Sequence, residues 1–225
     1  MAEAVVDAWV LDTAASPAPA RGSADAGALD DHERERLARL ADGPSVRAYL
    51  ELHLLARSQV GRLLRRPPGS LRFDRTCPDC GRQHGRPVLL DDPGLHLSLS
   101  RAGTVVALAL TRSAPVGIDV DEVEGTRFEG FEEVALHPRE RGEGAAGAEA
   151  QGRATTWVRK EAALKALGVG LRIEPASFVT PRPGVPSEVV PGLPRLVVVD
   201  IAAPVGRAAA VALLSADGPF EVRHH

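Results

Sequence analysis

The chain has 225 residues with 27 basic and 30 acidic side chains, a formal net charge of −3, and 44% hydrophobic residues. No apolar run approaches the ~20 residues of a membrane helix, the N-terminus lacks the basic start of a secretory signal, and an acidic balance disfavours a dedicated duplex-binding protein. We therefore expect a cytoplasmic protein that makes one large domain or two small ones.

The first 113 residues are predicted to contain two helices between strands. In chain order, the patterns predict a strand over 4–11, a loop over 13–27, helices over 30–40 and 46–64 with Ser45 as N-cap, an irregular basic stretch over 71–90, and strands over 95–99 and 104–111 around a turn at 100–103.

The rest of the chain repeats this order of helices before strands. The patterns predict a strand over 116–121, a helix over 127–134, a flexible insert over 141–153, a helix over 154–167 closed by Gly168, and strands over 196–201 and 207–214. Helices followed by strands, twice, predict an α+β fold of two halves, residues 1–113 and 114–225.

The basic residues are distributed unevenly between arginine and lysine. Of the 27, only Lys160 and Lys165 are lysines, and they lie close together in the predicted helix 154–167. Lysine offers a compact charge to phosphate and can lose its proton when desolvated, whereas arginine stays charged. Glu161 and Lys165 are four residues apart and share a helix face, which by itself indicates only a surface ion pair.

Two carboxylates alternate with apolar residues in the strand 116–121, Val-Gly-Ile-Asp-Val-Asp. Val116, Ile118 and Val120 are expected to face the core, with Asp119 and Asp121 together on the opposite face. Adjacent carboxylates repel unless a cation lies between them, and Mg²⁺ accepts such ligands together with substrate phosphates. Taken alone, the strand favours two solvated acids at a strand end over a metal site.

Three other segments carry polar chemistry. Ser98, Ser100 and Arg101 suit a phosphate at a turn or a polar hairpin tip. Cys77, Cys80 and His84 have zinc-ligand spacing but lack a fourth ligand, so we expect free thiols and no structural zinc. Eight arginines between residues 57 and 86 indicate a solvated face or a polyphosphate site, since aromatic residues for nucleic-acid stacking are scarce.

Together these elements resemble the 4′-phosphopantetheinyl transferases of the surfactin-synthetase-activating type. The resemblance rests on the strand 116–121, the helix segment from Trp157 to Lys165 (Trp-x-x-Lys-Glu-x-x-x-Lys), Gly85-Arg86-Pro87, and Ser98 to Arg101. It implies a monomer of two similar α+β halves related by a pseudo-twofold, with the active site at their interface.

The resemblance also implies roles for individual residues. Asp119, Asp121 and Glu161 would bind Mg²⁺, with Mn²⁺ as an alternative ion; Glu161 would be the general base, and Lys165 would assist the leaving group. Coenzyme A would be held by Arg47, His53, Arg86, Ser100, Arg101, Lys160 and Lys165. Arg101 stands where the family usually has histidine.

The implied reaction transfers 4′-phosphopantetheine from coenzyme A to a serine of an apo acyl- or peptidyl-carrier protein and releases 3′,5′-ADP. The carriers would belong to polyketide, nonribosomal peptide or fatty acid synthases, and neither nucleic acid nor membrane would be a partner. Two alternatives remain open at this stage. One is another Mg²⁺-dependent nucleotide phosphotransferase or hydrolase, and the other is a non-enzymatic zinc and nucleic-acid binding module.

Overall fold

A computed structural model of the chain describes residues 4–15, 27–41, 43–141, 149–215 and 218–225. Within these ranges the protein is a mixed α+β structure, as predicted, and no helix has the length and apolarity needed to cross a membrane. The helices are α1 (Asp31–Arg39), α2 (Pro44–Leu64), α3 (Phe131–Ala135) and α4 (Ala150–Leu167).

The strands form two main sheets and one hairpin. The first sheet has the order β4-β5-β1-β9, from β1 (Val5–Asp12), β4 (His96–Ala102), β5 (Val105–Thr111) and β9 (Glu221–His224). The second has the order β6-β8-β7, from β6 (Val116–Glu122), β7 (Leu196–Asp200) and β8 (Arg207–Leu214). A separate hairpin pairs β2 (Phe73–Thr76) with β3 (Gln83–Leu89).

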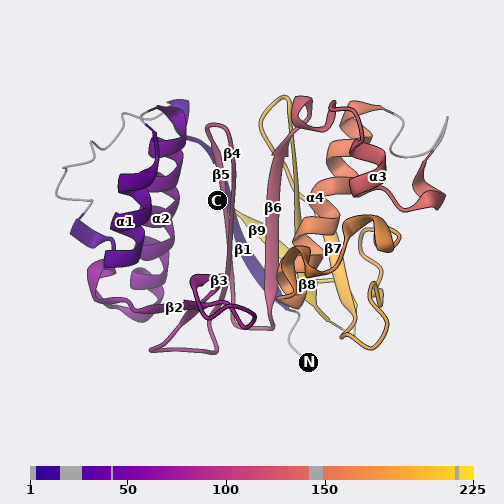
Figure 1. Cartoon of the computed structure of the whole chain (residues 1–225). Coiled ribbons are helices and arrows are strands. Elements are labelled where there is room, and N and C mark those ends of the chain that lie inside the picture. The colour runs from indigo at the N-terminus through magenta and orange to yellow at the C-terminus, as the bar shows by residue number, and fades with distance from the viewer. Residues whose placement is uncertain (1–3, 16–26, 42, 142–148, 216–217) are drawn as a thin grey trace.

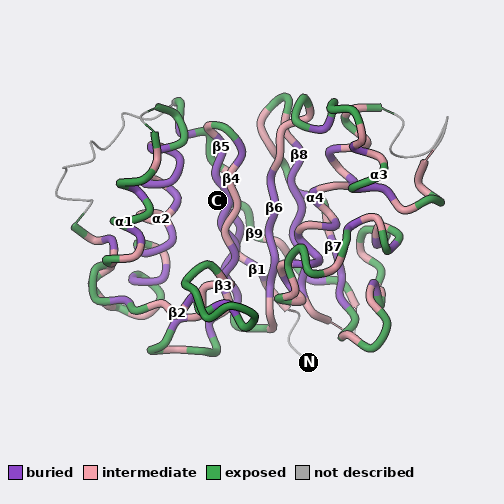
Figure 2. Tube along the Cα trace, in the orientation of Figure 1, coloured by how far each residue is buried: buried purple, intermediate pink, exposed green. Residues whose placement is uncertain are grey.

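The two sheets lie between helices, in layers that Figure 1 shows edge on. Helix α2 covers the outer face of the first sheet, with α1 packed against it, and α4 covers the outer face of the second. The inner faces meet in one apolar core that includes Val6, Val105, Ile118 and Val211. Figure 2 shows the resulting burial, which is concentrated in the central strands.

Strand β8 explains how α4 comes so close to its sheet. Ala208, Ala210 and Ala212 face α4, while Ala209 and Val211 alternate with them into the core between the sheets. Methyl side chains on one face let the helix approach, since side chains in a strand alternate between faces.

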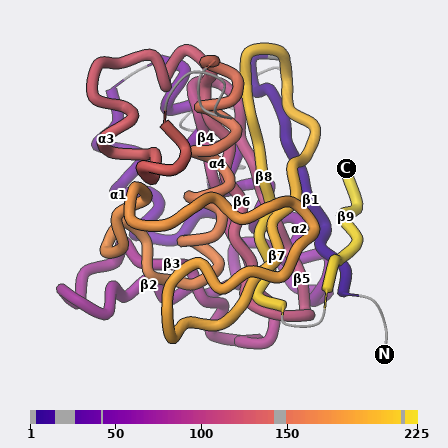
Figure 3. Tube along the Cα trace, turned by 90° about the vertical axis from the view of Figure 1, so that its right-hand side faces the viewer, coloured from indigo at the N-terminus to yellow at the C-terminus, as the bar shows by residue number. Residues whose placement is uncertain are grey.

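Each sheet contains one strand–helix–strand–strand sequence with the same pairing. In the first, β1 precedes α2 and pairs antiparallel with β5, which pairs with β4. In the second, β6 precedes α4 and pairs antiparallel with β8, which pairs with β7. The C-terminal strand β9 crosses back and pairs parallel with β1, so the last residues join the first sheet (Figure 3).

Several predicted boundaries were wrong for identifiable reasons. Helix α2 begins at Pro44 with Gly43 as N-cap, because proline suits the first helical turn, so Ser45 is not the cap. Strand β4 continues to Ala102, which places Ser100 and Arg101 inside a strand and not at a turn. Residues 71–90 contain β2 and β3, and α3 covers only part of the predicted 127–134. Gly168 does close α4, with a left-handed φ of 71°.

Candidate active site

Strand β6 carries two acids on the face that looks toward α4. Val116, Ile118 and Val120 point into the core between the sheets, as the alternation predicted. Asp119 and Asp121 pair with Ala210 and Ala208, whose side chains contact the α4 layer. The two carboxylates therefore lie under α4, although only Asp119 is fully buried.

Gly117 allows α4 to pack directly on β6. A Cβ at this position would overlap the carbonyl oxygen of Ala162 and lie 2.6 Å from the amide nitrogen of Ala166. No side chain fits in that space. The glycine therefore determines how close α4 lies to β6. This distance sets how near Glu161 and Lys165 of the helix are to the acids of the strand.

Lys165 bridges the edges of the two sheets. Its Nζ donates to Asp119 Oδ1 at 2.6 Å, to the Ile118 carbonyl at 3.1 Å and to the Leu99 carbonyl at 3.5 Å. Strands β4 and β6 are both edge strands, so these carbonyls have no sheet partner on that side. The lysine is 28% exposed, which leaves its ammonium accessible to a ligand.

Two serines of β4 also contact β6, so the edges of the two sheets meet along a seam formed by β4 and β6. The hydroxyl of Ser98 accepts a hydrogen bond from the Ile118 amide at 3.0 Å. The hydroxyl of Ser100 donates to Asp119 Oδ1 at 2.6 Å. Asp119 is thus oriented by a serine from one sheet and a lysine from the helix over the other.

Glu161 is the least satisfied acid of the site. Its Oε1 is buried and has no hydrogen-bond partner among the described residues. Burial, and then the negative charge of Asp119, raise the pKa of Glu161 to about 7, against the opposing effect of Lys165. A carboxyl group with this pKa can both hold and release a proton near neutrality.

The pKa of Asp121 is raised as well. Burial is the largest cause that raises its pKa, and the charge of Asp119 adds to it. Hydrogen bonds from the Glu122 amide and the Trp157 side chain act in the opposite sense. Two acids with raised pKa values beside a third favour a cation at this place.

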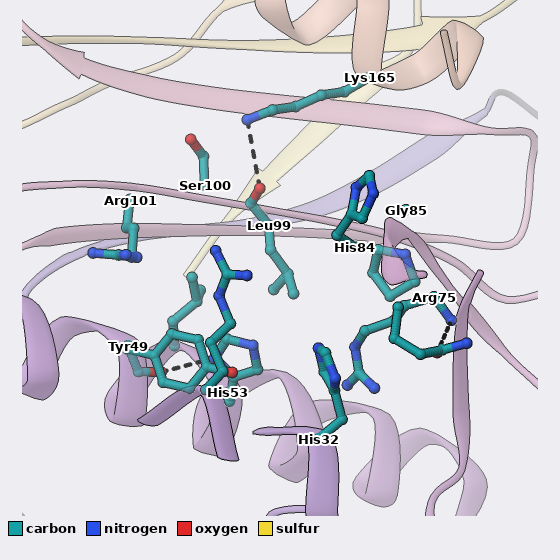
Figure 4. A pocket seen from close by; sticks show the side chains of 14 residues that line it. His32, Tyr49, His53, Arg75, His84, Gly85, Leu99, Ser100, Arg101 and Lys165 are labelled. Atoms are coloured by element: carbon teal, nitrogen blue, oxygen red, sulfur yellow. Dashed lines mark hydrogen bonds between the residues drawn. The ribbon is translucent and has the colours of Figure 1, made fainter. Parts of the chain in front are cut away.

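A cationic pocket opens between Lys165 and the helices α1 and α2 (Figure 4). It has a volume of about 350 Å³ and is lined by residues of α1, α2, β3, β4 and α4. Most of its polar lining is basic: His32, Arg36, His53, Arg75, His84, Arg101 and Lys165. The guanidinium of Arg101 has no hydrogen-bond partner within the described ranges, so it is available to an anion.

A second, neighbouring pocket of about 670 Å³ continues from the first. The two share His84, Gly85, Pro87, Leu99 and Lys165. The far wall of this neighbouring pocket is the end of α4 with the 3₁₀ turn Gly170–Arg172, and its near wall contains Cys77, Pro78 and Arg86. Gly85 is required here, because a Cβ would lie 2.9 Å from the Thr76 carbonyl oxygen.

Most residues predicted to hold coenzyme A line one of these pockets. His53, Ser100 and Arg101 line the cationic pocket with Lys165, and Arg86 lines the neighbouring pocket. Arg47 lines neither, since its Nε donates to Glu51 at 2.9 Å one turn along α2. For the neutral form of His53, the Nδ1 proton is directed to the Tyr49 carbonyl, and burial lowers its pKa.

The structure corrects the expectation for Lys160. This side chain is 0% exposed and its Nζ donates to Glu140 Oε2 at 2.7 Å and to the carbonyls of Ala135, Pro175 and Phe178 at 2.8–2.9 Å. It lies away from both pockets and cannot reach a phosphate there. Its partners identify it as a structural ammonium that ties α4 to the turns around it.

Sequence reasoning missed several pocket residues and misjudged part of the basic stretch. His32 and Arg36 reach the pocket from α1, which the sequence gave no reason to place there, and Tyr49 reaches it from α2, where only Arg47 and His53 were expected at the site. Arg57 is 1% exposed and donates to Glu33, Asp30 and two carbonyls, so it is a buried ion pair and not a solvated charge. Nothing in the local pattern distinguishes it from exposed arginines such as Arg62.

Comparison with known proteins bears on the C-terminal half. Residues 115–189 match the family model of the 4′-phosphopantetheinyl transferase superfamily. No curated protein matches the chain significantly. The matched segment begins at β6 and includes α4, so it contains Asp119, Asp121, Glu161 and both lysines. Residues 115–189 are therefore similar to the 4′-phosphopantetheinyl transferase superfamily, and this similarity supports a transferase.

Proposed function

We propose that the protein transfers 4′-phosphopantetheine from coenzyme A to a serine hydroxyl of an apo acyl- or peptidyl-carrier protein. The observation that carries the proposal is the group of Asp119, Asp121, Glu161 and Lys165 at the seam between the sheets, next to a pocket lined by basic residues. The family match falls on the segment that supplies this group.

Coenzyme A has a size and charge that suit the two pockets. Its phosphates would lie in the cationic pocket near Arg101 and Lys165, and its pantetheine arm would extend into the neighbouring pocket. The topological likeness of the two strand–helix–strand–strand units supports our further proposal that two halves, residues 1–113 and 114–225, are related by a pseudo-twofold with the site between them.

The three carboxylates offer the hard oxygen donors that Mg²⁺ prefers. Glu161 Oε1 has no hydrogen-bond partner among the described residues, and burial raises the pKa values of Glu161 and Asp121, so a cation there would compensate the charge of these acids. Asp119, Asp121 and Glu161 would hold the ion, which when bound neutralises charge on the diphosphate. Lys165 and Ser100 both donate to Asp119 Oδ1, so Asp119 Oδ2 is the oxygen that would be offered to the ion.

The chain's own residues then account for the group transfer. The carrier serine oxygen attacks the β-phosphorus of coenzyme A, and the bond from that phosphorus to the bridging oxygen breaks. Glu161 accepts the proton of the serine hydroxyl, consistent with a pKa of about 7. Lys165 compensates the charge that develops on the departing 3′,5′-ADP, and Arg101 holds a phosphate of the nucleotide.

Intact mass spectrometry of the carrier tests the proposal. Purified protein is incubated with coenzyme A, Mg²⁺ and each of several apo carrier proteins, with and without EDTA. We expect one phosphopantetheine on the carrier, abolished by EDTA, by Asp119→Ala and by Glu161→Gln. The exposed Gln151→Ala on the same helix is the matched control and should retain activity. Full activity of Asp119→Ala and Glu161→Gln would overturn the assignment.

The same reactions separate the main alternative. A nucleotide hydrolase using the same carboxylates would release 3′,5′-ADP from coenzyme A without any carrier. We expect no such release in the absence of carrier. Release of 3′,5′-ADP without a carrier would support a hydrolase and contradict the transferase assignment.

A further inference from the structure

The tip of the β2–β3 hairpin brings together three side chains that bind soft metals. The ligand atoms of Cys77, Cys80 and His84 lie within 4.8 Å of one another, and no other group of three His, Cys, Asp or Glu in the described ranges is as compact. Cys80 Sγ is 2.9 Å from His84 Nε2. The proposed transfer assigns no proton or phosphoryl step to any of the three.

The backbone around the two cysteines is folded tightly enough to hold both sulfurs. The Cys77 amide donates to the Arg82 carbonyl at 2.8 Å, and the Gly81 amide donates to the Cys77 carbonyl at 2.9 Å. Gly81 has a left-handed φ of 70°, which is readily accessible to glycine. This turn presents Cys80 on the same side as Cys77, and the strand after it returns His84 to them.

The hairpin tip has no buried apolar core of its own. Residues 78–84 are all exposed, and β2 and β3 pair only with each other. The apolar anchors Leu71 and Leu89 lie at the base of the excursion and not at its tip. Small excursions that cannot build a core of their own are commonly held by a metal or a disulfide.

The hairpin tip also contacts the site already described. Asp79, between the two cysteines, accepts from Arg172 at 3.1 Å, which joins the tip to the turn that follows α4. His84 lines both pockets and Cys77 lines the neighbouring one. Whatever fixes the hairpin tip therefore fixes one wall of the pockets.

We propose that Cys77, Cys80 and His84 bind one Zn²⁺ ion, which staples the β2–β3 hairpin and holds the wall of the neighbouring pocket. Thiolates and imidazoles are ligands that zinc prefers, whereas hard ions such as Mg²⁺ prefer carboxylates. Two thiolates neutralise the ion, and because Cys80 and His84 are exposed, a water molecule completes the tetrahedral set. This reverses the expectation of free thiols that the missing fourth ligand had suggested.

Metal titration of the full chain tests the site directly. Reduced, metal-free protein is titrated with Zn²⁺ against a chromophoric chelator, and with Co²⁺, whose sulfur-to-metal charge-transfer band requires thiolate ligation. We expect one equivalent bound, with an affinity at least about 10-fold weaker in Cys80→Ser and in His84→Gln. Both positions are exposed, so these variants are expected to fold.

The control addresses the other cluster of potential ligands, the C-terminal histidines. His224→Gln/His225→Gln should retain the full equivalent and the cobalt band. Hydrogen exchange of residues 73–89 should slow when Zn²⁺ binds to wild type and not when it is added to Cys80→Ser. Binding of less than one equivalent by reduced wild type, or binding that is lost with the C-terminal histidines and not with Cys80, would overturn the proposal.

Discussion

Lys160 and Lys165 stand five residues apart on α4, and at 100° per residue this places them about 140° apart around the helix. The face with Lys160 packs into the body of the C-terminal half, where three carbonyls and Glu140 surround one ammonium. The face with Lys165 looks across the seam of the sheets to Asp119 and the cationic pocket. One helix thus carries a structural lysine and a site lysine.

The comparison shows why this arginine-rich chain uses lysine twice. Four oxygens lie 2.7–2.9 Å from a single nitrogen at position 160, so they share the three N–H groups of a compact ammonium, a geometry that a planar guanidinium does not match. Burial lowers the pKa of Lys160, while Glu140 holds it charged. At position 165 the same compact charge reaches Asp119 and two edge carbonyls, leaving room for a ligand. A rare lysine in an arginine-rich chain therefore indicates a position that needs a compact charge. Such a position can stabilise the fold, as at Lys160, or lie at the candidate site, as at Lys165.

Replacing the structural lysine should have the largest effect on stability. Lys160→Met leaves Glu140 and three carbonyls buried without their donor, so we expect a loss of about 3–5 kcal/mol in the free energy of unfolding by urea. Lys160→Arg should also destabilise, because the fork does not match the oxygens. A Lys160→Met protein as stable as wild type would contradict the structural role of Lys160, and with it the difference proposed between the two faces of α4.

Replacing the site lysine should separate activity from stability. For Lys165→Met we expect proposed transfer activity to fall by about 10²–10³-fold, the scale for losing one group that stabilises transition-state charge. The free energy of unfolding should change less than in Lys160→Met, since Lys165 is partly exposed and Ser100 still donates to Asp119. Carrier modification and urea unfolding of the same preparation measure both. Activity within a few fold of wild type would contradict the role of Lys165.

The buried acid of the site face should make stability depend on pH. Because the pKa of Glu161 is raised from 4.5 to about 7, the folded protein keeps a proton that the unfolded chain has released between these values. Without Mg²⁺, stability relative to Glu161→Gln should therefore fall as pH rises from about 4.5 to 7, by about 3 kcal/mol at most. Urea unfolding in EDTA across this range measures the difference. A pH-independent difference would show that Glu161 has an ordinary pKa.

The smallest effect should come from the glycine that sets the height of α4. Gly117→Ala forces the helix away from β6, with an expected loss of about 1–3 kcal/mol for an overpacked position. Gly125→Ala is the matched control, because its Cβ would meet its nearest neighbours at 3.6 Å, an ordinary contact. Thermal unfolding of the two variants measures the contrast. Equal stability of the two would mean that α4 does not rest on β6 as closely as described.

Sequence reasoning found the elements with strong periodicity. The alternation in 116–121 and the helix ending at Gly168 are both confirmed, and they contain Asp119, Asp121, Glu161 and Lys165. It missed β2, β3 and β9, whose sequences have no clean apolar alternation of their own. Strand β9 forms because β1 offers a free edge more than 200 residues earlier in the chain, and no local pattern reports a distant edge.

The sequence by itself determined the face on which the acids of β6 lie, because a strand alternates its side chains, and it determined that Glu161 and Lys165 share a helix face, because a helix repeats every 3.6 residues. Only the tertiary structure decided what each face meets. It buried Lys160 and Arg57 among oxygens, exposed Lys165 to a pocket, and gathered Cys77, Cys80 and His84 at a hairpin tip. Periodicity is local and can be read along the chain, whereas burial and partners depend on contacts between segments far apart in it.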